Sequence, residues 1–182
     1  KIKLPNTKIK LLQQLLAKAI GEVKKINRIK GMDFTKKMQA LVERYNDREA
    51  NDILRSEVYE EMADALTELI WQVHKEFSAG DELGINFEEK AFYDILKELC
   101  VKYDFKYPDG KMIELAKAVK NLVDGQAKFP DWNKRDDIKS ALKVGLILLL
   151  DEYGYPPVEI DEVYIEIFEQ AENFKKNQTT VK

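Results

Sequence analysis

Hydrophobic residues recur every three or four positions along almost the whole chain, which is the spacing of one face of an α-helix. The longest clean example is the stretch 58–77. No stretch shows the sustained alternation of apolar and polar residues that marks a half-buried strand. The spacing predicts helices over residues 9–26, 34–45, 58–77, 87–99, 112–123, 138–153 and 163–174. We therefore predict an all-α fold, a helical bundle of about seven amphipathic helices.

Residues with known preferences for helix ends lie between these stretches. Gly31 is predicted to end the first helix and Asp33 to cap the second, because glycine favours helix ends and a carboxylate accepts from free N–H groups. Asn86, with Glu89 three residues later, predicts a capping box. Pro130 and Asp131 are expected to open the sixth helix. The boundaries favour short turns rather than long linkers.

Charge is divided unevenly along the 182 residues. Thirty Lys/Arg and thirty-three Asp/Glu leave a net charge of -3, which by itself argues against a dedicated nucleic-acid binder. Residues 1–48, however, hold thirteen basic and four acidic side chains, so residues 49–182 carry a charge of -12. We interpret 1–182 as a single helical assembly domain with a basic segment, 1–48, and an acidic body, 49–182. Each part could meet a different partner.

Seven basic side chains near the start of the chain are candidate contact residues: Lys8, Lys10, Lys18, Lys24, Lys25, Arg28 and Lys30. They could neutralise nucleic-acid phosphates. They could equally contact an acidic protein surface, or simply solvate a long helix. The sequence leaves these three alternatives open.

Residues suited to catalysis or metal binding are scarce. A single cysteine, Cys100, and a single histidine, His74, cannot form a Cys/His zinc site or a disulfide within the chain. The eight glycines are scattered, so no loop is predicted to cradle phosphate. Asp131, Asp137 and Lys139 have the letters of a nuclease signature, but the gap between the aspartates is too short and a helix replaces the usual β-hairpin. We predict no catalytic, cofactor-binding or metal-binding residue in this chain.

The longest dense apolar run, residues 144–150, is much shorter than a membrane span, and no signal peptide opens the sequence. We therefore expect a soluble cytoplasmic protein without a membrane partner. The first residue is Lys1 rather than methionine, so we also expect a fragment of a longer chain. Such a fragment can lack the active site of its parent.

Three segments resemble one known family. They are Phe34 to Arg48, which ends in Arg-Tyr-Asn-Asp-Arg, Glu82 to Leu96, which contains Ala-Phe-Tyr-Asp, and Asp131-Trp132 to the closing Tyr-Gly-Tyr-Pro-Pro at 153–157. Their order and spacing, over roughly residues 18–174, resemble the C-terminal helical region of the restriction (R) subunit of type I restriction–modification enzymes. Asn133-Lys134 departs from the more hydroxyl-rich or branched pair expected after the tryptophan.

The resemblance implies a parent protein with a nuclease domain and two helicase-like motor domains, which uses ATP and Mg²⁺ to translocate and cut unmethylated DNA. Its C-terminal helices are expected to dock it onto the modification (methyltransferase) subunit. None of the family's nuclease or ATPase motifs falls in this chain, so no catalytic residue is carried over. The chain alone is expected to be inactive, and to meet DNA through the parent complex.

Two other functions remain as alternatives. Residues 1–30 could form a DNA-contacting helical module whose lysines follow duplex phosphates. An independent small helical enzyme is disfavoured, because no nucleophile–base pair or ligand cluster is visible in the sequence. The leading interpretation is a non-catalytic domain that docks an ATP-dependent DNA translocase and endonuclease onto its methyltransferase.

Overall fold

The computed structural model describes residues 4–51, 55–126, 128 and 131–178. This part of the chain contains no strand, which confirms the all-α prediction. Its elements are α1 (Leu4–Ile26), α2 (Arg28–Asn51), α3 (Arg55–Glu76), η1 (Asp81–Leu83), α4 (Phe87–Lys102), α5 (Asp109–Gln126), η2 (Trp132–Lys134), α6 (Asp136–Glu152) and α7 (Asp161–Gln178). The chain forms two compact units: unit 1 holds residues 1–24 and 30–78, and unit 2 holds residues 25–29 and 79–182. The prediction of one assembly domain over 1–182 stays a prediction.

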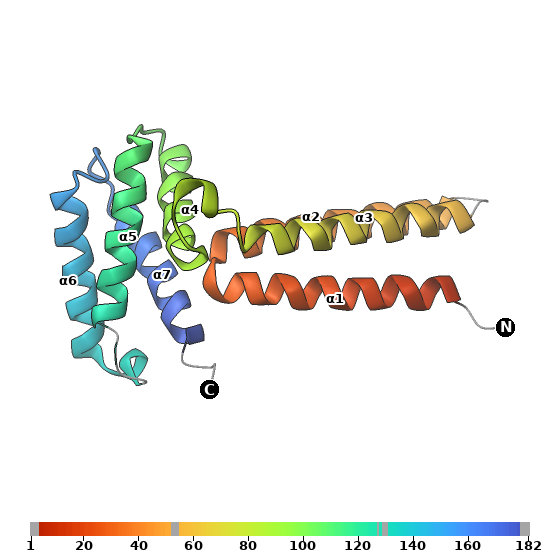
Figure 1. Ribbon diagram of the computed structural model, residues 1–182, viewed down its shortest axis with the longest axis horizontal. Coiled ribbons are helices and arrows are strands. Elements are labelled where there is room, and N and C mark those ends of the chain that lie inside the picture. Colours follow the sequence, from red (N-terminus) through yellow and green to blue (C-terminus); the bar gives the residue numbers. More distant parts are fainter. Residues whose placement is uncertain (1–3, 52–54, 127, 129–130, 179–182) are drawn as a thin grey trace. The chain divides into compact units, whose positions relative to one another are not determined.

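Unit 1 consists of long helices, α1, α2 and α3, which lie side by side (Figure 1). The apolar positions that repeat along the sequence turn inward, and the side chains of Leu16, Val23, Leu66 and Val73 are completely buried. The predicted charge boundary at residue 48 falls inside this unit rather than between the two. Packing therefore follows the hydrophobic pattern, and the change of charge does not mark the boundary between units.

The break between α1 and α2 lies at Asn27, so the prediction that Gly31 ends the first helix is wrong. Gly31 is buried within α2, where an added Cβ would lie 2.5 Å from the Cα of Lys24. The absence of a side chain lets the backbones of α1 and α2 approach closely at this point. Asp33 also lies within α2, and it is therefore not an N-cap.

Unit 2 is built from α4, α5, α6 and α7, with α5 packed between α4 and α6 and α7 packed against all three (Figure 1). The capping box predicted at the start of α4 is confirmed. Asn86 Oδ1 accepts from the Glu89 backbone at 2.8 Å, and Glu89 Oε2 accepts from the Asn86 backbone at 3.0 Å. Two helix N–H groups are satisfied in this way, and α4 begins where the sequence indicates.

The start of α6 differs from the prediction. The helix begins at Asp136, and the residues before it form the short helix η2. Asp131 stands before η2 but makes no side-chain cap, and Pro130 lies outside the described residues. The buried Trp132 explains the difference, because anchoring its ring in the core of unit 2 takes up the residues that would otherwise start α6. None of the described helices is long and apolar enough to cross a membrane.

Candidate interaction surfaces

The seven predicted basic contact residues are divided between the two units. Lys8, Lys10, Lys18, Lys24 and Lys30 belong to unit 1, whereas Lys25 and Arg28 belong to unit 2. The lysines of α1 are exposed, but they spread around its solvent side: Lys8 and Lys10 project roughly 160° apart at 3.6 residues per turn. Exposed Leu11 and Leu15 lie between Lys8 and Lys18 along the helix. DNA contact by these residues stays a prediction.

Residues 25–29 are fixed within unit 2 by a buried polar cluster. The Asn27 side chain is fully buried, and its Nδ2 donates to Asp94 Oδ2 at 2.7 Å. Lys90 Nζ donates to the same oxygen at 2.7 Å, and both members of this ion pair are about nine-tenths buried. Buried charges need such partners, because removal from water is costly. Asp94 of the Ala-Phe-Tyr-Asp motif therefore anchors Asn27, the residue between α1 and α2, to α4.

Gln170 of α7 forms hydrogen bonds with the backbone of the same segment, residues 25–29. Its side-chain oxygen accepts from the Arg28 backbone at 3.1 Å, and its nitrogen donates to the Ile26 carbonyl at 2.8 Å. The Arg28 guanidinium forms an ion pair with Glu169. These bonds satisfy backbone groups that the helix break exposes. Arg28 therefore has a structural role in unit 2, whatever else it contacts.

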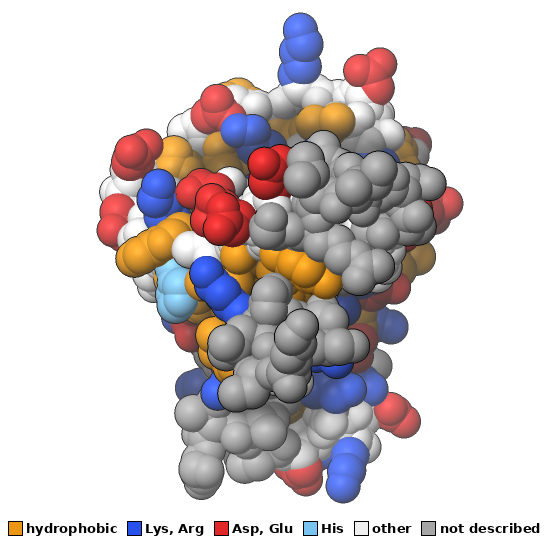
Figure 2. Space-filling model, turned by 90° about the vertical axis from the view of Figure 1, so that its right-hand side faces the viewer, with side chains coloured by type: hydrophobic (Ala, Val, Ile, Leu, Met, Phe, Trp, Pro, Cys, Tyr) orange, Lys and Arg blue, Asp and Glu red, His pale blue; other side chains and the backbone are white. Residues whose placement is uncertain are grey.

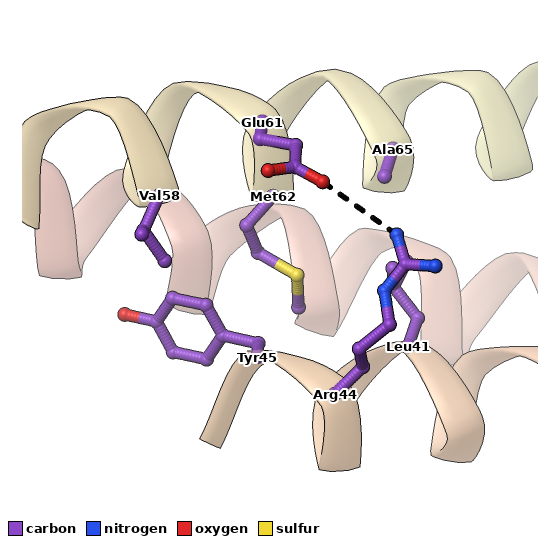
Figure 3. Close-up of a pocket in the computed structure, with 7 residues that line it drawn as sticks. All are labelled: Leu41, Arg44, Tyr45, Val58, Glu61, Met62 and Ala65. Atoms are coloured by element: carbon purple, nitrogen blue, oxygen red, sulfur yellow. Dashed lines mark ion pairs between the residues drawn. The ribbon is translucent and has the colours of Figure 1, made fainter. Parts of the chain in front are cut away.

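The Arg-Tyr-Asn-Asp-Arg motif lines a small cavity between α2 and α3 (Figure 3). The Tyr45 ring faces Val58 and Met62, while Arg44 reaches Glu61 at 3.6 Å. The cavity measures about 20 Å³, which is room for one water molecule rather than a ligand. Arg44 and Tyr45 of this motif therefore join two helices of unit 1, and the cavity that they line is too small for a ligand. The side chain of Arg48 lies outside the described residues.

The Tyr-Gly-Tyr-Pro-Pro motif also has a structural role. The Tyr155 hydroxyl is buried and donates to the Leu96 carbonyl at 2.7 Å. The rings of Phe105 and Tyr107 pack edge-on against Tyr155, with centroids 5.5 and 5.1 Å away. Burial, with the Cys100 thiol beside it, raises the pKa of Tyr155 far above its usual range. The phenol therefore remains neutral and joins α4 to the segment after α6.

Groups with catalytic potential are dispersed. No three His, Cys, Asp or Glu residues in the described part of the chain converge as metal ligands would. His74 is exposed, and Figure 2 shows its side chain in pale blue at the surface. Cys100 is half-buried, and burial raises the pKa of its thiol, which lowers its nucleophilicity. Asp137 is paired with Arg135 at 2.7 Å at the exposed start of α6. The prediction that the chain holds no cofactor stays a prediction.

Helix α6 is apolar on two faces. Its inner face packs Leu142, Leu146 and Leu150 into the core of unit 2. On the opposite side the structure exposes three further large apolar side chains, 56% of Val144, 47% of Ile147 and 64% of Leu148. A helix that is hydrophobic all round is normally buried on all sides. The outer face of α6 is therefore a surface of the kind that binds a partner.

A groove runs between α6 and α7, next to this face. It measures about 180 Å³ and lies wholly within unit 2. Five of its six lining residues are apolar or aromatic, and the set comprises Lys143, Leu146, Ile147, Tyr164, Ile165 and Phe168. Ile165 of α7 is 56% exposed. We call this feature the α6–α7 groove.

The two ends of the α6–α7 groove differ in charge. Near Tyr164, burial and the negative charges of Asp151, Asp161 and Glu159 raise the pKa of the phenol. One helical turn further along α7, Lys143 Nζ lies 4.7 Å from the centre of the Phe168 ring, a cation–π contact. The groove therefore has carboxylates where α6 ends and α7 begins, and a lysine near Phe168.

A second groove lies between α1 and α2 in unit 1, with a volume of about 440 Å³. Its apolar lining includes Ile20, Met38 and Val42, of which Ile20 is buried and the others are partly buried. None of these three apolar side chains is exposed, whereas Ile147 and Ile165 of the α6–α7 groove are 47% and 56% exposed. The α6–α7 groove is therefore the stronger candidate for an interface.

Comparison with known proteins places the chain in a family. The family described as type I restriction enzyme HindI endonuclease subunit-like, C-terminal, matches residues 1–177. A Methanocaldococcus jannaschii protein described as the MjaIXP endonuclease subunit of a type I restriction enzyme is 27% identical over 154 residues, which cover 81% of this chain. The type I restriction enzyme HindI endonuclease subunit of Haemophilus influenzae is 21% identical over 174 residues, or 96% of the chain.

The chain spans only 13% and 16% of the lengths of these two relatives. No solved structure matches it. The match extends over both units, and it includes the three motifs whose structural roles are described above. The chain therefore belongs to the family of C-terminal domains of type I restriction enzyme endonuclease subunits.

Proposed function

We propose that this chain is the assembly domain that docks the endonuclease subunit onto the modification (methyltransferase) subunit of its restriction system. The observation that carries the proposal is the outer face of α6, where Val144, Ile147 and Leu148 are each about half exposed or more. Burying the exposed half of such a side chain against a partner contributes on the order of 1 kcal/mol. Three such side chains on one helix make a suitable centre for a protein interface.

In this proposal the chain binds a partner and the rest of the endonuclease subunit carries out the chemistry. The positions of the polar motif residues support this assignment. The motif residues Asp94 and Tyr155 are engaged inside unit 2, where they stabilise the fold. The surface they support is apolar, so it suits binding rather than chemistry. The nuclease and motor activities, with their ATP and Mg²⁺, belong in this proposal to the rest of the endonuclease subunit. DNA meets this chain through the assembled complex.

The test is direct binding of the chain to the modification subunit of the same restriction system, measured by biolayer interferometry. We expect saturable binding that persists at 0.5 M salt, because an interface centred on apolar side chains is weakly screened. A chain with an intact helical circular dichroism spectrum that is not retained at any salt concentration contradicts the proposal. So does Mg²⁺-dependent DNA cleavage by the chain alone.

The DNA-contacting alternative predicts a different salt response. If the exposed lysines of α1 contact phosphates, the logarithm of the affinity for a DNA duplex falls linearly with the logarithm of salt concentration, with a slope of about -0.9 for each phosphate contacted. A steep slope that is lost in the Lys8→Ala/Lys18→Ala variant favours this alternative. Binding that is undetectable at low salt rejects it.

A further inference from the structure

We propose that the docking site extends from the outer face of α6 into the α6–α7 groove, and that the groove binds an amphipathic helix of the modification subunit with Lys or Arg at the end that lies over Asp151, Glu159 and Asp161. This inference rests on the proposed function and deepens it. It specifies the surface of this chain, the secondary structure of the occupant, and the occupant's orientation.

The shape and lining of the groove favour a helix as the occupant. Ile147 projects from α6 and Ile165 from α7, so two half-exposed branched side chains form the walls. Tyr164 and Phe168 line the same groove one turn apart on α7. A helix with apolar residues at positions i, i+3, i+4 and i+7 places its ridge into such a groove. The resulting contact would bury apolar surface that α6 and α7 now expose.

Charge determines which helix fits and in which direction. Asp151 lies in the last turn of α6, and Asp161 is the first residue of α7, with Glu159 two residues before it. All three carboxylates act electrostatically on the Tyr164 phenol. Lys143 lies at the Phe168 side of the same groove. A helix whose first turn lies over the carboxylates gains from its own dipole as well as from Lys or Arg side chains there. An acidic helix would meet repulsion at that end.

The experiment measures the affinity of the full chain for the modification subunit, with one variant for each feature and a matched control for each. Ile147→Glu places a charge in the groove, and we expect it to weaken binding at least about tenfold, the loss of one buried side chain. Leu15→Glu alters a similarly exposed position, 52% exposed on α1, and should change the affinity less than about twofold.

Charge reversal tests the acidic end. Asp161→Lys should weaken binding severalfold at low salt and reduce the salt dependence, because it removes an attraction and adds a repulsion. Asp64→Lys on the exposed side of α3 is the matched control and should leave both unchanged. Circular dichroism of all four variants checks that the helices remain folded.

Cross-linking identifies the occupant. With the photoreactive residue p-benzoylphenylalanine at position 165, we expect cross-links to a segment of the modification subunit with helical apolar spacing and a basic end. Cross-links to a second copy of this chain, or affinity that is unchanged in Ile147→Glu, overturn the inference while leaving the proposed function intact. Failure of the unaltered chain to bind the modification subunit at all overturns both.

Discussion

Asp94 is the residue on which the buried polar cluster depends, because one of its oxygens accepts from both Asn27 and Lys90. Removing one member of a buried ion pair is costly, so Asp94→Ala should lower the free energy of unfolding by about 3–5 kcal/mol. Urea denaturation followed by circular dichroism measures this change. The double variant Lys90→Met/Asp94→Leu should recover part of the loss, because it removes the uncompensated charge of Lys90 but not the loss of the acceptor of Asn27. A single variant as stable as the unaltered chain would contradict the structural role assigned to the cluster.

The buried phenol of Tyr155 makes the stability of the folded chain depend on pH. Its folded-state pKa lies above the value of about 10 in an unfolded chain. Above pH 10 the unfolded chain therefore releases a proton that the folded chain retains, and stability falls by about 1.4 kcal/mol per pH unit. Below pH 10 both states are protonated, and this contribution to stability is fully present.

Tyr155→Phe should separate the two roles of the phenol. At neutral pH the variant should lose about 1 kcal/mol, because the hydrogen bond to the Leu96 carbonyl is absent. Above pH 10 its stability should fall less steeply than that of the unaltered chain, since one titrating group is gone. Urea unfolding at pH 7, 9, 10 and 11 gives both quantities. Parallel curves across the whole range would show that Tyr155 does not couple folding to pH.

The close approach of α1 and α2 at Gly31 gives a prediction for these helices. In Gly31→Ala the new methyl group would lie 2.5 Å from the Lys24 backbone, so the helices must separate, and we expect a loss of about 1–3 kcal/mol. Gly21→Ala is the matched control. Its Cβ meets nothing within 4 Å, and alanine's better helix propensity should stabilise α1 by up to about 1 kcal/mol. Equal thermal unfolding temperatures for the two variants would refute the close contact.

The same region shows how far the sequence predicts these helices. The signals that decide the start of α4, Asn86 and Glu89, lie three residues apart, and the capping box is confirmed. The sequence does not predict the break at Asn27, because the residues that bond this segment are remote along the chain. Asp94 lies 67 residues away, and Gln170, which bonds the Arg28 backbone, lies 142 residues from Arg28. Tertiary contacts of this kind leave no local pattern, so Gly31 was the wrong choice.

For the whole molecule, the sequence predicts the all-α class, which the structure confirms for the residues it describes, and the family, which the comparison with known proteins confirms. It could not place the candidate interface. The apolar run at 144–150 was visible, but which of its side chains turn inward depends on the positions of α5 and α7. The basic residues of the sequence instead predict a contact surface on α1. Charge is apparent in a sequence, whereas a second apolar face on a helix is recognised only when its first face has been packed.

Hydrogen–deuterium exchange of the chain, alone and with the modification subunit, shows which helices the modification subunit covers. We predict that binding slows exchange chiefly in the second half of α6 and the first half of α7, around Ile147 and Ile165, because an occupied α6–α7 groove suppresses local opening of these helices. Exchange in α1 should change little. Protection confined to α1 at saturating concentrations of the modification subunit would show that the α6–α7 groove is not the docking site. So would the absence of protection anywhere in the chain.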